Sequence, residues 1–337
     1  MNSLLKVTRV CVPLSLDCNL HCKYCYRDKE KLDSIPAFTE DMIFYLGSLK
    51  PDKCECVCAS GGEPLMHWDK VKELFSYVPK NVHKKVMSNC LLLTQEIVDY
   101  LNENNIELSV SHDGKLTKFL RGVDVLRDKR ICNLVRQVKI MRVVGVVTKY
   151  NVDVWENFFD TATLLRRTNF EYVGLPLNDI PAQYDLIDGF DYDTWSRTWF
   201  EFTVSPYRRL LPWYRGITLT LPKTGIIRRA GFNVLPNGVV CGIANICSNY
   251  GTVNDDFMDC YEKLCKTGEV DYCKNANCKF IDICRFGPTC DTEHIRRYRT
   301  MVMEFKANPE RVKSLRMYVR EHLSEIEKKY GYIREQR

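Results

Sequence analysis

The chain has 337 residues, of which 45% are hydrophobic and 27% are charged, as in an ordinary globular protein. No stretch approaches the roughly 20 uninterrupted apolar residues that a membrane-spanning helix needs. The N-terminus lacks the apolar run and the small-residue cleavage site of an export signal. These observations exclude a helical membrane protein and predict a cytoplasmic one, long enough for a large catalytic domain and a smaller second domain.

The formal net charge of +6 is concentrated near the C-terminus. Residues 292–337 contain 12 Lys and Arg against 7 Asp and Glu, a net charge of +5. We interpret this run as a solvated basic helix face, because charge runs alone are weak signals. An acidic partner, such as RNA or an anionic peptide, is the alternative.

Strand-like and helix-like segments alternate through the first half of the chain. Strands are predicted at residues 7–16, 54–59, around Val86, 107–111, 138–147 and 172–175, and helices at 39–49, 68–77, 94–104 and 152–167. Such alternation predicts parallel strands joined by right-handed crossovers. Six units fit an open barrel better than a closed eight-unit one. We therefore predict an α/β fold, a partial (β/α)6 TIM-like barrel.

The segment 176–222 interrupts this alternation and is rich in aromatic residues. Trp195, Trp199 and Phe202 recur at helical spacing, which favours packing against the barrel over a wall of the substrate cavity. We include this connecting segment in a barrel domain of residues 1–222. A second domain, residues 223–337, begins with a hairpin around a Pro-Asn-Gly turn at 236–238. It closes with one long amphipathic helix whose apolar positions span 312–330.

The chain contains 17 cysteines, an odd number that cannot pair completely. Disulfides are rare in a reducing cytoplasm, where thiolates more often bind metals or carry out redox chemistry. Cys54, Cys56 and Cys58 alternate along one predicted strand and share a face. We interpret these three as buried small hydrophobes, with a metal-binding edge as the alternative.

Three other cysteines, Cys18, Cys22 and Cys25, follow the first strand with the spacing C-x3-C-x2-C. Three thiolates can bind three irons of a four-iron cluster and leave the fourth iron open, as catalytic metal sites do. His21 or a neighbouring acid could supply a fourth ligand. A zinc knuckle is the weaker interpretation, because no Cys or His pair follows at zinc spacing.

A second motif, Gly61-Gly62-Glu63-Pro64, ends the second predicted strand. Glycines let a backbone approach a ligand closely, and a carboxylate beside them can accept a hydrogen bond from an ammonium group. Alone the tetrapeptide could be a tight turn. Its place one βα unit after the cysteine motif favours a role in binding a cofactor.

The cysteine motif resembles that of the radical S-adenosylmethionine (SAM) superfamily, C-x3-C-x-aromatic-C, with Tyr24 in the aromatic position. The resemblance implies that Cys18, Cys22 and Cys25 bind a [4Fe–4S] cluster whose open iron chelates SAM. One electron, from a donor such as flavodoxin or ferredoxin, would cleave SAM to methionine and a 5′-deoxyadenosyl radical that abstracts a hydrogen atom. The segment Gly61, Gly62, Glu63 and Pro64 would hold the SAM amino group.

Other positions match the family less closely. Ser88-Asn89-Cys90 stands where relatives often have Thr-Asn-Gly, so that Cys90 replaces a glycine. The resemblance places Ser111 and Asp113 near the SAM ribose or the substrate, and pairs Arg121 with the SAM carboxylate. Asn151 matches a family asparagine, although it could also cap a helix. Around the expected cavity, the candidates for proton transfer are Cys90, His112 and Asp113.

The second domain resembles the SPASM or twitch domain of many radical SAM enzymes, which binds auxiliary [4Fe–4S] clusters. The candidate ligands in this chain are Cys241, Cys247, Cys260, Cys265, Cys273, Cys278, Cys284 and Cys290. Their spacing departs from the family pattern, and Arg228 stands where relatives have a cysteine. We expect at least one auxiliary cluster, with structural zinc as the alternative.

Relatives with SPASM domains mostly modify ribosomally made peptides or protein side chains by crosslinking, epimerisation or oxidation. Peptide modification is therefore the first hypothesis for this chain. Only 17 residues precede Cys18, which leaves no room for an N-terminal leader-binding domain and weakens the crosslinking case. The second hypothesis is a small-molecule radical dehydrogenase or rearrangement enzyme, and the third is an RNA-modifying factor. Of these partners, nucleic acid is the least expected.

Overall fold

The computed structural model describes residues 5–25, 35–52, 54–176, 185–208, 228–241, 249–256, 259–260, 263 and 293–332. Within these residues the strands form one nine-stranded sheet in the order β6-β5-β4-β3-β2-β1-β7-β8-β9. The strands are β1 Leu5–Pro13, β2 Cys56–Ser60, β3 His83–Ser88, β4 Glu107–Ser111, β5 Met141–Val147, β6 Glu171–Pro176, β7 Arg228–Val234, β8 Val239–Cys241 and β9 Gly251–Thr252.

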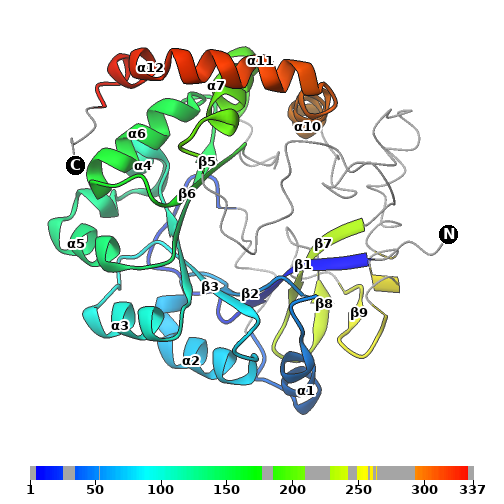
Figure 1. Cartoon of the computed structure of the whole chain (residues 1–337). Coiled ribbons are helices and arrows are strands. Elements are labelled where there is room, and N and C mark those ends of the chain that lie inside the picture. Colours follow the sequence, from blue (N-terminus) through cyan, green and yellow to red (C-terminus); the bar gives the residue numbers. More distant parts are fainter. Residues whose placement is uncertain are drawn as a thin grey trace.

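Strands β1 to β6 pair in parallel and in chain order. Figure 1 shows the sheet curving into an open barrel whose outer face is covered by helices. These helices are α1 Glu40–Ser48, α2 Trp68–Tyr77, α3 Gln95–Glu103, α5 Lys129–Gln137 and α6 Val154–Leu165. The prediction of an α/β partial barrel is confirmed. Helix α3 begins at the cap residue Thr94, whose side chain accepts a hydrogen bond from Ile97 N.

Alternate residues of each strand face the helices and the barrel interior. The helix side is apolar and includes Val10, Val57, Leu108 and Val143, all with no exposed surface. Cys54, Cys56 and Cys58 are likewise buried, and burial raises the pKa of each thiol. Their interpretation as packed side chains is confirmed.

The interior at the amino end of the strands is charged. The side chains of His83, Glu107, Arg142 and Glu171 form what we call the basal charge cluster. His83 Nε2 lies 2.8 Å from Glu107 Oε2, and Arg142 bridges Glu107 Oε1 at 3.2 Å and Glu171 Oε2 at 2.8 Å. Buried charges need such pairing, because each loses its hydration shell.

Glu107 is the centre of the basal charge cluster and is fully buried. Burial by itself raises the pKa of its carboxyl, but the hydrogen bond from His83 and the charges of Lys85 and Arg142 outweigh burial and lower the pKa to about 2. The ionised form of Glu107 is therefore stabilised by the fold.

The region between β4 and β5 departs from the prediction. The predicted strand 138–147 begins only at Met141, and the segment before it contains α4 Thr117–Arg121, the short turn η3 Val125–Arg127 and α5. These elements were missed because they are short and rich in basic residues. The starts of η3 and α5 are set by local caps, with Asp124 accepting from Leu126 N and Asp128 from Ile131 N.

Helix α7, Tyr192–Val204, carries the aromatic stripe. Trp195 and Phe202 are 1% and 3% exposed, and the Phe202 ring lies 5.3 Å from the Trp155 ring of α6. The prediction that this stripe packs against the barrel is confirmed. Trp213 and Tyr214, which belong to the same aromatic-rich segment, lie outside the described residues.

The predicted hairpin is also present, since β7 and β8 pair antiparallel around Gly238 at φ +83°. Strand β7 pairs in parallel with β1, so that the hairpin extends the barrel sheet. The boundary at 222/223 therefore separates parts that share one sheet, and the division into two domains stays a prediction.

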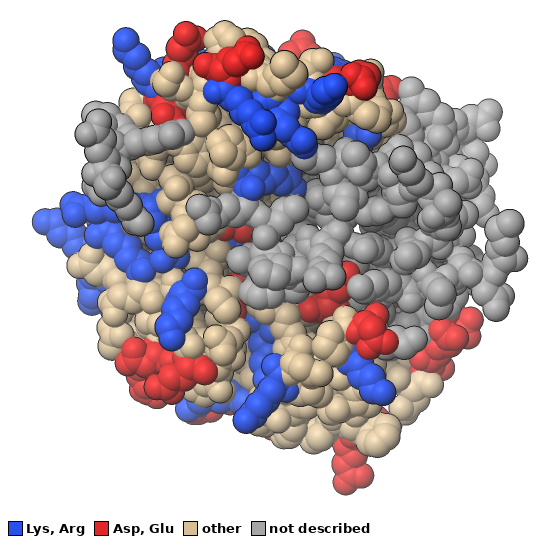
Figure 2. Space-filling model, viewed as in Figure 1, with Lys and Arg blue, Asp and Glu red and all other residues tan. Residues whose placement is uncertain are grey.

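The single long terminal helix is corrected to two helices, α11 Pro309–Glu321 and α12 Leu323–Lys329, preceded by α10 Glu293–Lys306. His322 leaves helical geometry at φ −103° and ψ 13°, and its Nδ1 donates to the Tyr318 carbonyl oxygen at 2.9 Å. In Figure 2, acidic and basic side chains are mixed along the top of the molecule, where Figure 1 places these helices, which fits a solvated face. No described helix combines the length and apolarity needed to cross a bilayer.

The pKa of Glu107 predicts a specific acid sensitivity. Because its folded-state pKa of about 2 lies below the ordinary value of 4.5, Glu107 stabilises the fold above pH 4.5, and this contribution is lost as the pH falls towards 2. We expect Glu107→Gln to lower the free energy of unfolding by about 3 kcal/mol at pH 7 and by much less near pH 2. Urea unfolding between pH 2.5 and 7 measures this difference.

The matched control is Glu103→Gln, an exposed carboxylate at the end of α3. It should leave the pH dependence of the wild type unchanged. If the free energy of unfolding depends on pH equally in Glu107→Gln and in the wild type, the role of the basal charge cluster is contradicted.

Candidate active site

The two predicted motifs meet at the carboxyl end of the parallel strands, where barrel enzymes place their active sites. The loop after β1, residues 14–25, carries Cys18, Cys22 and Cys25, and we call it the cluster loop. Its first residues bind the Gly61–Pro64 segment through Gly62 N to Ser15 O at 2.7 Å and Glu63 N to Asp17 O at 2.7 Å. The predicted proximity of the two motifs is therefore observed as direct backbone contact.

This contact explains why positions 61 and 62 both require glycine. A Cβ atom on Gly62 would lie 1.7 Å from the carbonyl oxygen of Asp17. Gly61 has φ +129°, and its Cβ would lie 2.4 Å from the carbonyl oxygen of Ser15. Any larger residue at either position would push the cluster loop away.

Glu63 connects the ends of β2 and β3. It is 2% exposed, and its carboxylate accepts hydrogen bonds from Ser88 Oγ at 2.7 Å, Asn89 N at 2.7 Å and Leu65 N at 3.1 Å. Pro64 follows as the first residue of the short turn η1, Pro64–His67. The donors fix the carboxylate at the strand ends, beside the cluster loop.

In the turn after β3, Cys90 adopts a backbone conformation that is typical of glycine. Cys90 has φ +65°, the left-handed region in which a side chain is strained. Cys90 therefore adopts a backbone conformation that favours the glycine it replaces. Burial raises the pKa of the fully buried Cys90 thiol, which disfavours the thiolate that a proton acceptor would need. Next to it, Asn89 Nδ2 donates to Asn19 Oδ1 in the cluster loop at 2.7 Å.

Tyr24, Asp113 and Arg121 form one buried group. The Tyr24 hydroxyl donates to Asp113 Oδ2 at 2.6 Å, and Arg121 binds both oxygens of Asp113 at 2.7 and 3.0 Å. Burial raises the pKa of Tyr24 well above its usual value. Burial alone would lower the pKa of Arg121, but the adjacent carboxylate of Asp113 outweighs it and raises that pKa. Both Tyr24 and Arg121 are therefore held in their protonated forms.

Asn151 and Ser111 also lie at the carboxyl ends of the strands. Asn151 Oδ1 accepts from Thr148 N at 2.7 Å, and its Nδ2 donates to the carbonyl oxygens of Val146 and Asp113 at 3.0 and 3.3 Å. The cap of α6 is Asp153, so the helix-cap alternative for Asn151 is wrong. Ser111 is the last residue of β4 and is partly exposed.

His112 points away from the strand ends. It is fully buried, with Nδ1 2.8 Å from Thr161 Oγ1 of α6 and Nε2 donating to Asp124 Oδ1 at 3.2 Å. These contacts place it in the packing between β4 and the helices. The structure thus separates His112 from the other proton-transfer candidates, because side chains alternate between the two faces of the sheet.

The auxiliary cysteines are only partly described. Cys241 ends β8 and Cys260 follows β9, and both are fully buried. Cys247, Cys265, Cys273, Cys278, Cys284 and Cys290 lie outside the described residues. Among the residues that are described, no three His, Cys, Asp or Glu side chains converge as a metal site. The auxiliary cluster stays a prediction.

The donor chemistry of the cluster loop fits an iron–sulfur cluster. Cys18 and Cys22 are partly exposed and Cys25 is exposed, so none of the three residues is buried. Cys25 N donates to Cys22 O at 3.1 Å, which closes a tight turn between two of them. Burial raises the pKa of the Cys22 thiol, and the positive charge of Arg121 only partly opposes that rise, so the thiol loses its proton only when a metal binds it.

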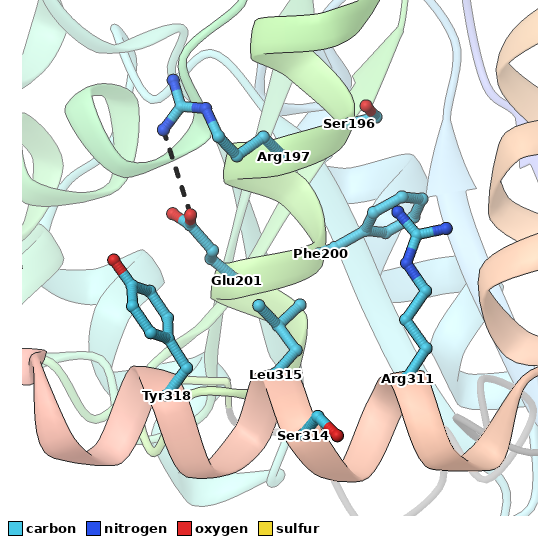
Figure 3. Close-up of a pocket in the computed structure, with 8 residues that line it drawn as sticks. All are labelled: Ser196, Arg197, Phe200, Glu201, Arg311, Ser314, Leu315 and Tyr318. Carbon is cyan, nitrogen blue, oxygen red and sulfur yellow. Dashed lines mark ion pairs between the residues drawn. The ribbon is translucent and has the colours of Figure 1, made fainter.

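A separate cavity of about 410 Å³ lies between α7 and α11 (Figure 3). Its lining residues are Ser196, Arg197, Phe200, Glu201, Arg311, Ser314, Leu315 and Tyr318. Arg197 and Glu201 form an ion pair along α7, with Nη1 3.9 Å from Oε1. None of the predicted site residues lines this cavity, so we do not identify it with the active site.

Comparison with known families agrees with the geometry. Residues 12–176 match the model of the radical SAM superfamily. This range begins in β1 and ends with β6, and it contains the cluster loop and every strand end described above. The chain therefore belongs to the radical SAM superfamily, and membership implies SAM and a [4Fe–4S] cluster as cofactors.

Solved structures share the fold over most of the chain. The protein anSMEcpe with bound AdoMet is 18% identical, with a TM-score of 0.62, over 93% of this chain and 99% of that one. SuiB of Streptococcus suis bound to the precursor peptide SuiA is 16% identical, with a TM-score of 0.59, over 84% and 72% of the two chains. At these identities the likeness establishes the fold. No curated protein sequence matches significantly.

The contact between Gly62 and Asp17 predicts the effect of a single methyl group. We expect Gly62→Ala to displace the cluster loop, because its Cβ would overlap the Asp17 carbonyl oxygen at 1.7 Å. Overpacking of this kind costs about 1–3 kcal/mol in stability. Iron content after anaerobic reconstitution, measured beside thermal unfolding, should fall well below that of the wild type.

Gly47→Ala provides the control. Gly47 lies in α1, and its Cβ would meet only Tyr77 O at 3.8 Å. That change should leave iron content intact and stabilise the helix by about 0.5–1 kcal/mol. Full iron loading of Gly62→Ala would show that the contact does not position the cluster loop.

Proposed function

We propose that this enzyme uses a [4Fe–4S] cluster on Cys18, Cys22 and Cys25 to cleave SAM and to abstract a hydrogen atom from a peptide or protein side chain. The observation that carries the proposal is the backbone contact of the three-cysteine loop with the Gly61–Pro64 segment at the strand ends. When bound, the cluster and SAM supply the electron transfer and the 5′-deoxyadenosyl radical.

The protein's own residues bind and orient the cofactor. Glu63 presents a fixed carboxylate beside the cluster loop, suited to the SAM amino group. Arg121 supplies a permanently charged guanidinium at the same strand ends. Asn151 is tied by its amide to the ends of β4 and β5 and so fixes the distance between them. The partly exposed Ser111 lies at the end of β4 beside this group.

A peptide substrate is favoured by what two neighbours in fold bind. The structure of anSMEcpe with AdoMet and the Cp18Cys peptide has a TM-score of 0.60 with this chain and is 16% identical over 93% of it. SuiB was solved with its precursor peptide. By this analogy the open barrel would admit an extended peptide. The proposed reaction is a crosslink, an epimerisation or an oxidation. We further propose that the enzyme works in the reducing cytoplasm and receives its electron from a flavodoxin or ferredoxin.

An auxiliary [4Fe–4S] cluster on the C-terminal cysteines belongs to the same proposal. It would accept the electron that remains after hydrogen abstraction, or bind the substrate. The alternative substrate class is a small molecule undergoing radical dehydrogenation or rearrangement. RNA modification is the third alternative, and acidic and basic side chains are mixed on the face of the C-terminal helices that Figure 2 shows.

Removing one cluster ligand tests the catalytic part of the proposal. Cys22→Ala should abolish reductive cleavage of SAM to 5′-deoxyadenosine, measured by chromatography after anaerobic reconstitution with dithionite. The control is Cys132→Ala, a buried cysteine of α5 whose thiol donates to Leu164 O, and it should retain cleavage. Wild-type cleavage by Cys22→Ala would overturn the assignment of the cluster loop.

The substrate class is tested by mass spectrometry. The enzyme is incubated with SAM, dithionite and short peptides encoded beside its gene, in parallel with a pool of small metabolites. A crosslink or an oxidation should remove two hydrogen atoms from a peptide. Epimerisation in deuterated water should replace one hydrogen atom of the peptide by deuterium. Turnover of a metabolite, with every peptide unchanged, would favour the small-molecule alternative.

A further inference from the structure

The cluster loop is attached to the opposite side of the barrel opening as well as to the Gly61–Pro64 segment. Lys23 N donates to Leu120 O of α4 at 2.8 Å, and the Lys23 ammonium lies 3.7 Å from the centre of the Phe119 ring. Next to it, Tyr24 reaches Asp113, which follows β4. Lys23 and Tyr24, which lie between Cys22 and Cys25, therefore bind this loop to α4 and to the end of β4 through both backbone and side chains.

Asp113 is the centre of this attachment. Its Oδ2 accepts from the Tyr24 hydroxyl at 2.6 Å and from Arg121 Nε at 2.7 Å. Its Oδ1 accepts from Arg121 Nη2 at 3.0 Å and from Val146 N at 2.8 Å. Each oxygen thus receives two donors, the full capacity of a carboxylate, and Asp113 has no exposed surface.

A carboxylate held in this way is poorly suited to proton transfer. To accept a proton, Asp113 would have to give up a hydrogen bond and leave the guanidinium of Arg121 buried without its counter-charge. Arg121 is 8% exposed, and two of its nitrogens face Asp113. In this arrangement the guanidinium orients Asp113 through Nε and Nη2.

We propose that Asp113 is a positioning residue that fixes the cluster loop on β4 and α4 through Tyr24 before any cofactor binds, with Arg121 and Val146 holding Asp113 in place. The proposal rests on the assignment of this loop as the cluster loop. Its physical basis is preorganisation, since a loop already held in the binding geometry loses less conformational entropy when the cluster and SAM bind.

The first test needs no metal. Backbone amide hydrogen exchange is measured on the metal-free chain, with the Lys23 amide as the reporter, because it donates to Leu120 O. We expect its exchange to be about tenfold faster in Tyr24→Phe, which loses one charge-assisted hydrogen bond. The effect should be larger in Asp113→Asn, whose amide group would turn a donor towards either Arg121 Nε or Val146 N.

Asp124→Asn is the matched control. Asp124 is another buried carboxylate, and it binds His112 and Arg127 but makes no contact with the cluster loop. It should lower overall stability and leave Lys23 exchange unchanged relative to the rest of the chain. If Asp113→Asn does not fold, Tyr24→Phe still decides the question, because the phenyl ring keeps its packing and loses only the hydroxyl.

The second test is spectroscopic and uses the reconstituted enzyme. In Tyr24→Phe we expect normal iron content. SAM is titrated into the reduced enzyme, and the change that it causes in the electron paramagnetic resonance spectrum of the cluster is measured. Half of that change should require a several-fold higher SAM concentration in Tyr24→Phe than in the wild type. Wild-type Lys23 exchange and a wild-type SAM titration in this variant would overturn the proposal. If the wild type itself shows no SAM-dependent change, the proposed function fails, while the exchange experiment still decides the role of Asp113.

Discussion

The absence of a side chain at Gly62 is the constraint on which the site depends. Its backbone lies directly against Asp17, so that the end of β2 and the cluster loop after β1 are joined by main-chain hydrogen bonds. This contact brings three cysteines to the opening of a barrel whose strands were already aligned by parallel pairing. The chemistry of the family follows from that placement, since the thiols, a fixed carboxylate and a guanidinium share one edge of the sheet.

Buried carboxylates hold the rest of the barrel opening in position. Glu63 joins the ends of β2 and β3, and Asp113 joins β4, α4 and the cluster loop. At the other end of the barrel, Glu107 performs a comparable task among His83 and Arg142. Polar side chains in a barrel interior are expensive to bury, and here each is matched by donors from neighbouring strands. The same pairing occupies the oxygens of these carboxylates with donors from the protein, which assigns them to positioning.

The sequence predicted the barrel, its parallel strands and the two cofactor motifs, because these depend on local periodicity and on short, well-spaced residue patterns. It missed α4, which spans only five residues and begins without a side-chain cap, and α5, which is short, rich in basic residues and capped by Asp128. It also grouped His112 with Asp113, although adjacent residues at a strand end face opposite sides of the sheet. The bonds of Asn19 to Asn89 and of Tyr24 to Asp113 join residues far apart in sequence, so spacing alone could not reveal them.

In the function we propose, SAM binds directly to an iron of a cluster held by Cys18, Cys22 and Cys25. Electron–nuclear double resonance of the reduced, reconstituted enzyme with SAM labelled by 15N in its amino group measures this contact. The account predicts a hyperfine coupling between that nitrogen and the cluster, lost when the three cysteines are replaced by alanine. An iron-loaded, reduced wild type that shows no coupling to bound SAM would contradict it.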